Sequence, residues 1–355
     1  MRILAFSSDK VASSWQRILL PFHWMHKLGI AEIRWGERET DDAFTWSDIC
    51  VFQRWYAGRT HHWFRTMRLY GVRLVYELDD DCWRIERDNP FQSFYAREQL
   101  DAMEDMVRAA ALVTVPSRGL AEAMARWNRN VAVIPNGVDP GAFELPVRRR
   151  EGEVRLGFAG SRTHDRDFAP LLAALPRVLR RHPQARLVVV GDPPTRLAPM
   201  LRAERLMDRA TFTGWVKWEG DPERGEPGLY ETLAAHGIDV CLVPLRQSQF
   251  NRGKSNIKWV EASATGACTA AADVGIYAET IRDGVNGRLV AGNGEVRWQR
   301  VLEELVEDAP QRERLWRAAR AEVRGRYAYD RLAYEWAAAL RGVVPTDGGK
   351  NARVV

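Results

Sequence analysis

Residues 240–266 begin as a strand-like segment and end as a helical one, with a basic loop that has no acidic residue between them. Between Asp239 and Glu261 the chain carries four cations, namely Arg246, Arg252, Lys254 and Lys258. A helix N-terminus presents free N–H groups, and neighbouring cations add positive charge, so an anion such as a diphosphate is favoured there. The loop therefore predicts a phosphate site in which Lys254, Lys258 and Arg246 contact the diphosphate.

The helix that follows this loop places three charged side chains on one face. Ser255 is the expected N-cap and Gly266 the expected stop. Lys254, Lys258 and Glu261 stand at i, i+4 and i+7 spacing. Glu261 can accept hydrogen bonds from a ribose diol, as the acidic residue of dinucleotide sites does. The helix thus predicts a site for a nucleoside diphosphate, and the alternative interpretation is a solvated basic face with one ion pair.

A second polar cluster, Gly160, Ser161, Thr163 and His164, follows an expected strand near the start of the second half. Backbone N–H groups in such a loop can hold the distal phosphate. His164 is expected to contact phosphate or acceptor, although an isolated histidine is more often structural.

Three adjacent carboxylates, Asp79, Asp80 and Asp81, follow an expected strand in the first half. One of them can bind an acceptor hydroxyl or act as a general base. The alternative is a capping or loop cluster. A metal site is a third option, but no partner ligands are evident nearby, and we expect no metal and no cofactor.

The remaining basic residues of the first half bear on the acceptor. Lys10 in the first loop (7–14) and Arg17 in the helix after it could reach a phosphate or an acidic acceptor, or lie in solvent. The acid-free run 49–76 interleaves aromatic residues with five arginines, Arg54, Arg59, Arg65, Arg68 and Arg73. This pattern suits nucleic acid, an anionic membrane surface or an acidic glycan. The alternative is a basic helix whose aromatic residues are buried.

Short apolar runs alternate with helical stretches along the whole chain. In the first half we expect strands at 2–6, 33–35, 49–53, 73–78, 112–115 and 131–134, with helices at 14–28, 60–70, 91–110 and 118–127. In the second half we expect strands at 155–159, 186–190, 210–212, 240–243, 268–271 and 287–290. Its helices are expected at 168–181, 194–205, 228–236, 256–264, 277–283 and 294–320. This rhythm predicts βαβ units and parallel sheets.

The fold class predicted is α/β, with two doubly wound Rossmann-like domains facing each other across a cleft. We expect an acceptor-side domain at 1–142, a basic linker at 143–152 and a donor domain at 153–325. A last amphipathic helix at 326–343 is expected to pack back on the first domain, before a frayed tail at 344–355. Ligands of such sheets bind at the carboxyl ends of the strands, so the cleft is the expected site.

Composition excludes several classes of protein. The chain has 355 residues, of which 46% are hydrophobic and 28% charged, which argues against a disordered chain, a collagen and a small disulfide scaffold. The four cysteines form no CxxC pair, so we expect buried free thiols in a reducing compartment. No apolar run is long enough to span a bilayer, and we expect a cytoplasmic protein, with peripheral membrane contact as an option. The net charge of +5 permits anionic ligands without demanding nucleic acid.

Six segments in this order resemble the family 4 glycosyltransferases of GT-B architecture. They are VIPNGVD (133–139), GFAGSRTHDRDF (157–168), VVVGDPP (188–194), FTGWV (212–216), GKSNIKWVEASATGACTAA (253–271) and IRDGVNGRLV (281–290). The resemblance implies that the second domain holds a nucleotide-sugar donor, such as a UDP- or GDP-sugar, and that the first holds the acceptor. It also implies sugar transfer with retention of configuration. Donor contacts are assigned by resemblance to Asp192, Ser255 and Asn256 as well.

The chain departs from the family at one position. Many members carry Glu–x7–Glu, and if Glu261 is the second acid, the first would stand at Gly253. The chain is closer to a subgroup with a Lys-Ser-x-x-Lys-x-x-Glu pattern. Asn251, or backbone N–H groups around Gly253, could take the role of the missing acid, because a glycine lets the backbone approach a phosphate.

The function expected is transfer of a sugar from a nucleoside diphosphate sugar to an acceptor hydroxyl. A bacterial surface polysaccharide, or a lipid-linked precursor of one, is the acceptor we favour, and a hydroxylated DNA base or a protein side chain is the alternative. Two rivals stand beside it. One is a non-catalytic module that only binds glycan or nucleotide. The other is a Rossmann oxidoreductase, which the absence of Gly-x-Gly-x-x-Gly after the first strand disfavours.

Overall fold

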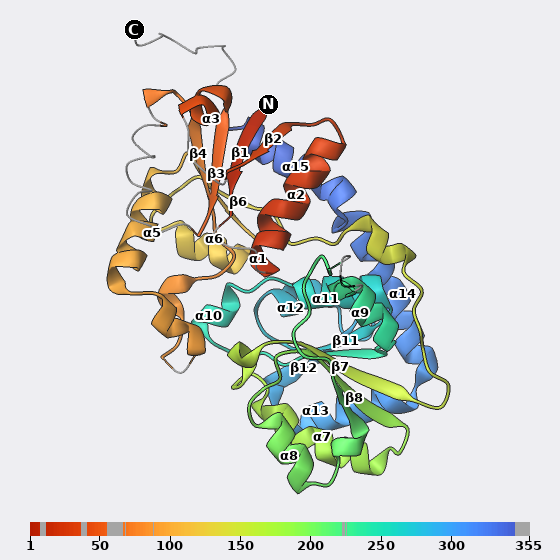
Figure 1. The fold of residues 1–355 in the computed structure, drawn as a ribbon. Helices are drawn as coiled ribbons and strands as arrows, with labels where there is room; N and C mark the ends of the chain where they lie inside the picture. Colours follow the sequence, from red (N-terminus) through yellow and green to blue (C-terminus); the bar gives the residue numbers. More distant parts are fainter. Residues whose placement is uncertain are drawn as a thin grey trace.

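The chain folds into two α/β halves, each built on its own parallel sheet (Figure 1). The computed structural model describes residues 1–7, 12–36, 41–54, 67, 69–87, 89–221, 224 and 226–344. The expectation of two doubly wound sheets is confirmed, and the strands predicted from apolar runs are all present within one or two residues of their expected ends. Most of the predicted helix at 60–70, and the whole tail from 345 onward, lie outside the described residues.

The first sheet has the strand order β2-β1-β3-β4-β5-β6, with every described pair parallel. Its strands are β1 (Arg2–Phe6), β2 (Glu32–Trp35), β3 (Ile49–Gln53), β4 (Arg73–Glu77), β5 (Leu112–Val115) and β6 (Val131–Val133). The order reverses between β1 and β3, and such a switch point opens a crevice at the carboxyl ends of the strands. Arg54 and the Asp79–Asp81 cluster follow β3 and β4 at that edge.

The helices of the first half differ from the expected ones in a π turn, in the later start of α5 (Arg97–Ala109) and in α3 (Asp41–Trp46), which was not expected. They are α1 (Ala12–Ser14), a π-helical turn η1 (Trp15–Leu19), α2 (Leu20–Lys27), α3 (Asp41–Trp46), the 3-10 turns η2 (Cys82–Arg84) and η3 (Pro90–Phe94), α5 (Arg97–Ala109) and α6 (Arg118–Met124). The π turn stands just before Pro21, which has no N–H to donate to the preceding turn. The helix expected from residue 91 begins only at Arg97, because a separate 3-10 turn starts at Pro90.

The second sheet has the order β12-β11-β10-β7-β8-β9, which is the Rossmann arrangement with its switch point between β7 and β10. Its strands are β7 (Val154–Gly160), β8 (Ala185–Gly191), β9 (Ala210–Phe212), β10 (Val240–Val243), β11 (Cys268–Ala272) and β12 (Arg288–Val290). The loops after β7 and β10 carry the Gly160–Asp167 segment and Arg246. The topology therefore brings together two segments that lie far apart in the sequence.

The helices of the second half are α7 (Ala169–Arg181), α8 (Leu197–Ala203), α9 (Leu229–His236), α10 (Gln249–Arg252), α11 (Ile257–Thr265), α12 (Gly275–Thr280), α13 (Glu295–Glu307) and α14 (Ala309–Arg326). The prediction of a single helix over 294–320 is wrong, because the first helix ends before Asp308 and a second begins after it. The Asp308 carboxylate accepts the Gln311 N–H at 2.7 Å, and Pro310 starts a new helix rather than continuing the old one.

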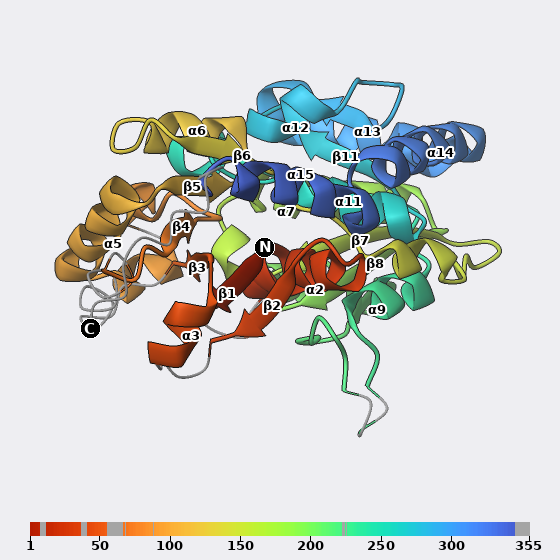
Figure 2. The ribbon, with the colours of Figure 1, turned by 90° about the horizontal axis from the view of Figure 1, so that it is seen from above.

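The last helix, α15 (Tyr329–Arg341), returns to the first half and lies beside α2 in both views (Figure 1, Figure 2). Its Trp336 packs edge-on against Phe22 of α2, with ring centroids 5.4 Å apart, in a core that also contains Ile3 of β1. A short parallel bridge between Val138 and Ala328 joins the two chain crossings between the halves. The chain therefore crosses between the halves twice, and this bridge holds the two crossing segments together.

The four cysteines are free and buried, as expected for small core side chains. None of the helices in the described part of the chain combines the length and hydropathy that a membrane crossing requires.

Candidate active site in the cleft

Two adjoining cavities lie between the halves. The larger has a volume of about 430 Å³ and the smaller about 220 Å³. Both are lined by Ser13, Asp79, Asp80, His164 and Lys254. Because the two cavities share these residues from both halves, they form one continuous site.

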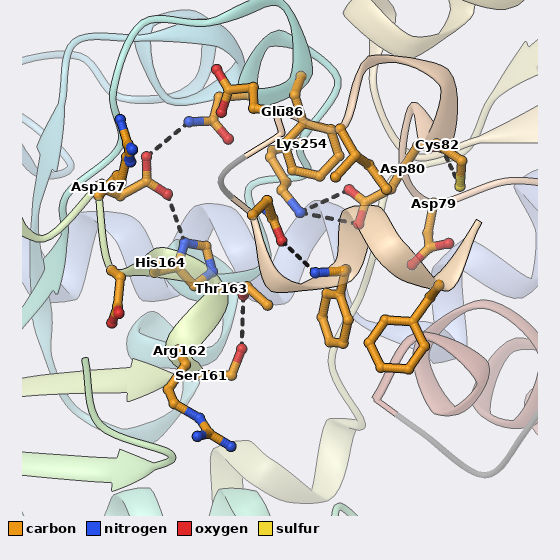
Figure 3. A pocket seen from close by; sticks show the side chains of 18 of the residues that line it. Asp79, Asp80, Cys82, Glu86, Ser161, Arg162, Thr163, His164, Asp167 and Lys254 are labelled. Atoms are coloured by element: carbon orange, nitrogen blue, oxygen red, sulfur yellow. Dashed lines mark hydrogen bonds and ion pairs between the residues drawn. The ribbon is translucent and has the colours of Figure 1, made fainter. Parts of the chain in front are cut away.

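Lys254 spans this site and pairs with the opposite half. Its Nζ lies 2.9 and 3.0 Å from the two carboxylate oxygens of Asp80, and the same ammonium lies 4.4 Å from the ring centroid of Phe250 (Figure 3). Lys254 stands between α10 and α11, whereas Asp80 follows β4. The cation that the sequence assigns to a diphosphate therefore faces the cleft, and a carboxylate contacts it in this structure.

A second ion pair crosses the cleft beside the first. The Arg246 guanidinium, from the loop after β10, pairs with Glu86, which follows η2. The Arg246 backbone N–H also donates to Asp167 Oδ1 at 2.9 Å. Both cations of the larger cavity that were predicted to bind phosphate are therefore matched by carboxylates of the first half.

Lys258 and Glu261 extend from α11 into the smaller cavity. Lys258 Nζ donates to the Ala159 carbonyl. Glu261 is only 3% exposed, and its Oε1 has no hydrogen-bond partner in the structure. Burial raises the pKa of Glu261 to about 7, although Lys258 opposes the shift. A buried carboxylate oxygen without a partner in a cavity wall is available to a ligand hydroxyl.

His164 is held by Asp167 rather than left as an isolated side chain. Its Nδ1 lies 2.9 Å from Asp167 Oδ2, while Asn251 Nδ2 donates to Asp167 Oδ1 at 2.9 Å (Figure 3). Burial lowers the pKa of His164, so its ring is neutral near pH 7. Burial would raise the pKa of Asp167, but the hydrogen bonds from His164 and other donors hold it below its usual value. Nδ1–H therefore donates to Asp167, and Nε2 is an acceptor.

Asp79 is paired with an arginine that the sequence assigned to a different surface. Arg54 Nε lies 2.8 Å from Asp79 Oδ1, and both side chains are largely buried. Burial raises the pKa of Asp79 above its usual value even though Arg54 opposes it. Arg54 has a φ of 44°, an unfavourable backbone conformation of the kind found near functional sites. The Arg54 side chain lines the larger cavity and is paired with Asp79, so it does not lie on an open surface where a nucleic-acid strand could bind it.

Several predicted donor residues lie near the cavities without lining them. They are Gly160, Asp192, Gly253 and Asn256. Asp192 pairs with Arg162 at 2.6 Å, and the buried Asn256 side chain donates to Thr280. The Gly253 carbonyl accepts the Ser117 hydroxyl at 2.7 Å, and its φ of −79° is open to any residue. The expectation that glycine is needed here for a close backbone approach has no support in this geometry.

Arg17 and Asp81 also lie outside the cavity walls. Arg17 is fully buried, neither solvated nor facing an acceptor, because its guanidinium pairs with Glu77 at 2.8 Å and donates to Asn136 at 3.0 Å. Asp81 is buried and faces Arg84 at 3.6 Å.

Of the remaining basic residues that the sequence assigns to the acceptor, only Arg73 is described, and it lines neither cavity. Arg73 begins β4, at the edge of the sheet opposite the cleft. Lys10, Arg59, Arg65 and Arg68 lie outside the described residues.

Three further predicted residues line the cavities, but the expectation that Ser255 is the N-cap is wrong, because Asn256 holds that position before α11 and its side chain makes no capping hydrogen bond. Ser161 and Thr163 line the larger cavity and hydrogen-bond each other at 2.8 Å, and Ser255 lines the smaller one and accepts from Asn136 at 3.0 Å. Over the described ranges, no group of three or more His, Cys, Asp or Glu side chains is arranged to hold a metal ion.

Some residues of the site were missed from the sequence. Asp167 could have been found from its i, i+3 spacing to His164, and Arg54 from its place directly after β3 at the switch point. Glu86 and Trp215 carried no comparable signal, since their contact with the site depends on how the two halves meet.

The sequence of the chain is similar to those of known glycosyltransferases. Residues 153–308 match the family described as "Glycosyl transferases group 1". The chain is 30% identical over 286 residues to the D-inositol 3-phosphate glycosyltransferase of Stackebrandtia nassauensis, a match that covers 74% of this chain and 58% of that protein. It is 30% identical over 195 residues to the phosphatidyl-myo-inositol mannosyltransferase of Mycobacterium tuberculosis, covering 53% of this chain and 46% of that protein. The chain thus spans about half the length of the curated relatives it matches.

Solved structures share the fold at low sequence identity. Sucrose-phosphate synthase of Thermosynechococcus elongatus superposes with a TM-score of 0.73 at 14% identity, covering 97% of this chain and 99% of that one. Anabaena HepE, solved with UDP and glucose, superposes with a TM-score of 0.69 at 15% identity, covering 96% of this chain and all of that one.

Proposed function

The second half of the chain is a group 1 glycosyl transferase domain, and from this premise we propose that the protein transfers a sugar from a nucleoside diphosphate sugar to an acceptor hydroxyl. The observation that carries the proposal is the site around α11. Lys254, Lys258 and Glu261 all face the cleft, and Glu261 offers a buried oxygen without a partner.

The donor occupies the smaller cavity and its junction with the larger one. Glu261 accepts the ribose hydroxyls, while Lys258 and Lys254 contact the diphosphate, with Arg246 near the transferred sugar. These side chains supply the positive charge that a diphosphate requires, so we propose that they, rather than a metal ion, neutralise it. UDP and UDP-glucose in the HepE structures make a uridine donor the first choice, with a guanosine donor second.

The reaction replaces one bond at the anomeric carbon. The acceptor oxygen forms a bond to that carbon, the bond from the carbon to the distal phosphate oxygen breaks, and its electron pair remains on the diphosphate. The hydroxyl proton passes to the departing phosphate oxygen. Attack from the side of the leaving group retains the configuration, as the family resemblance implies, and Lys254 and Lys258 stabilise the charge that develops.

The acceptor is a carbohydrate, and we propose a bacterial surface polysaccharide or its precursor. The relatives act on inositol phosphate and on an inositol lipid according to their names, so hydroxyl-rich acceptors are common among them. Of the two arginines of the run 49–76 that the structure describes, Arg54 is paired with Asp79 and Arg73 lines neither cavity, so neither favours a DNA acceptor.

The test is nucleotide binding and donor turnover with matched variants. Calorimetry with UDP and GDP measures binding, and release of the nucleotide from the sugar donor measures turnover. We expect Lys254→Ala to lower turnover about 10²–10³-fold, while Lys27→Ala, which alters an exposed lysine of α2 outside both cavities, behaves as wild type. A wild-type protein that binds nucleotide but neither hydrolyses nor transfers from any donor would be the non-catalytic module instead.

A further inference from the structure

The larger cavity carries an aromatic surface that the donor site does not use. Phe91 and Phe94 of η3 line it with ring centroids 5.3 Å apart, and they are 49% and 61% exposed. Trp215, which follows β9 in the second half, lines the same cavity and is 67% exposed. Large aromatic side chains left open beside a cavity suit a ligand with an apolar face.

The charges around this cavity are balanced. Among its described lining residues, five are Lys or Arg and five are Asp or Glu, and His164 is neutral. Four of the cations have partner carboxylates, in the pairs Arg54–Asp79, Lys254–Asp80, Arg246–Glu86 and Arg162–Asp192. The wall therefore offers no excess positive charge to an anionic ligand.

Donor binding would shift this balance toward negative charge. A diphosphate that takes Lys254 leaves the Asp80 carboxylate without its cation. Glu86 stays paired with Arg246 but has lone pairs left to accept further hydrogen bonds. Both carboxylates can then accept from sugar hydroxyls, whereas an uncompensated Asp80 would repel phosphate or carboxylate groups of an acceptor.

We propose that the larger cavity is the acceptor subsite and takes an uncharged sugar ring. This inference rests on the proposed function and names the substrate class for it. The C–H face of the ring packs on Phe91, Phe94 or Trp215, while Asp80 and Glu86 accept its hydroxyls. An acyl chain fits less well, since carboxylates lie among the aromatic rings and Ile85 is the one aliphatic side chain of the described lining.

The charge preference is tested with pairs of acceptors that differ only in charge. Methyl glycosides and myo-inositol are compared with their monophosphates, inositol 3-phosphate included, by saturation-transfer NMR on the full chain with UDP present. We expect the neutral member of each pair to bind and the phosphate to bind at least tenfold more weakly. Preference for the phosphates, or binding only of detergent or lipid tails, would overturn the proposal.

The aromatic surface is tested with alanine variants. Phe94→Ala and Trp215→Ala should each weaken acceptor binding about tenfold, with UDP affinity within about twofold of wild type, and Phe94→Tyr should restore binding. Tyr334→Ala, which removes an exposed aromatic ring on α15 outside both cavities, is the matched control. Unchanged acceptor binding in both alanine variants would refute the subsite. Absence of UDP binding in the wild type, measured by calorimetry without any acceptor, would count against the donor site and not against the acceptor subsite.

Discussion

The substitution Glu261→Gln removes the ionisable carboxyl while keeping the size of the side chain, and the effect of this substitution on the free energy of unfolding depends on pH. Glu261 is buried in the wall of the smaller cavity, where burial raises its pKa from 4.5 to about 7. The carboxyl therefore stays protonated in the folded protein over a pH range in which the unfolded chain releases the proton. Glutamine keeps the size and polarity of the protonated form but cannot ionise.

The size of the effect follows from the shift in pKa. A raised folded-state pKa contributes stability that is fully present below pH 4.5 and is lost as pH rises through about 7. Each unit of pKa corresponds to about 1.4 kcal/mol, so the free energy of unfolding of the wild type should fall by roughly 3 kcal/mol relative to Glu261→Gln across this window. Above it the difference should level off.

The assay is chemical unfolding of both proteins without nucleotide, at pH values from 4.5 to 8. Other groups with shifted pKa values, such as Asp79, are present in both proteins and cancel in the difference. A difference between the two unfolding free energies that stays constant over the range would refute the account of Glu261 as a buried, desolvated carboxyl.

The same variant also tests what the carboxyl does. Ribose hydroxyls that donate to Glu261 would favour its ionised form and lower its pKa. UDP binding near pH 6.5 should therefore release more protons from the wild type than from Glu261→Gln, as measured by calorimetry in buffers of different ionisation enthalpy. Equal release would make the residue structural. The protein would then carry an unfavourable buried acid without benefit to ligand binding.

Two further predictions concern other residues of the cleft. Lys254→Ala should lower turnover about 10²–10³-fold, the usual effect of removing one donor that stabilises a developing anion. Steady-state kinetics with Lys27→Ala as the control measures this effect, and near-normal turnover in Lys254→Ala would show that Lys254 does not contact the phosphate. Arg17→Met should lower the free energy of unfolding by about 3–5 kcal/mol, because Glu77 remains buried without its cation. Adding Glu77→Leu should restore most of this stability, as measured by urea unfolding. An Arg17→Met variant as stable as the wild type would contradict the account of this pair.

Much of the fold and the donor side of the site could be predicted from the sequence. Alternation of apolar runs and helical stretches predicted the strands, because parallel strands are buried and bounded by turns. The rule that ligands bind at carboxyl ends of strands put Asp79, Asp80 and Lys254 near one cleft, and the structure brings Asp80 and Lys254 into direct contact. The spacing along α11 correctly put Lys258 and Glu261 on one face.

The predictions that failed concern residues whose contacts come from segments far apart in the sequence. Arg17 could not be recognised as a buried residue, because it lies in η1 while its partner Glu77 ends the strand β4, and helical periodicity says nothing of such distant pairs. Arg54 was grouped with its basic neighbours, although the end of β3 turns it toward Asp79. The ion pair between Arg246 and Glu86 depends on how the halves meet, and no local pattern encodes that.

The most direct test of the central claim is an experimental structure of the protein with UDP or GDP bound. We predict a ribose hydroxyl within hydrogen-bond distance of Glu261 Oε1, and Lys254 Nζ on the diphosphate instead of on Asp80. A nucleotide bound elsewhere, with Glu261 unpartnered and the Lys254–Asp80 pair intact, would contradict it.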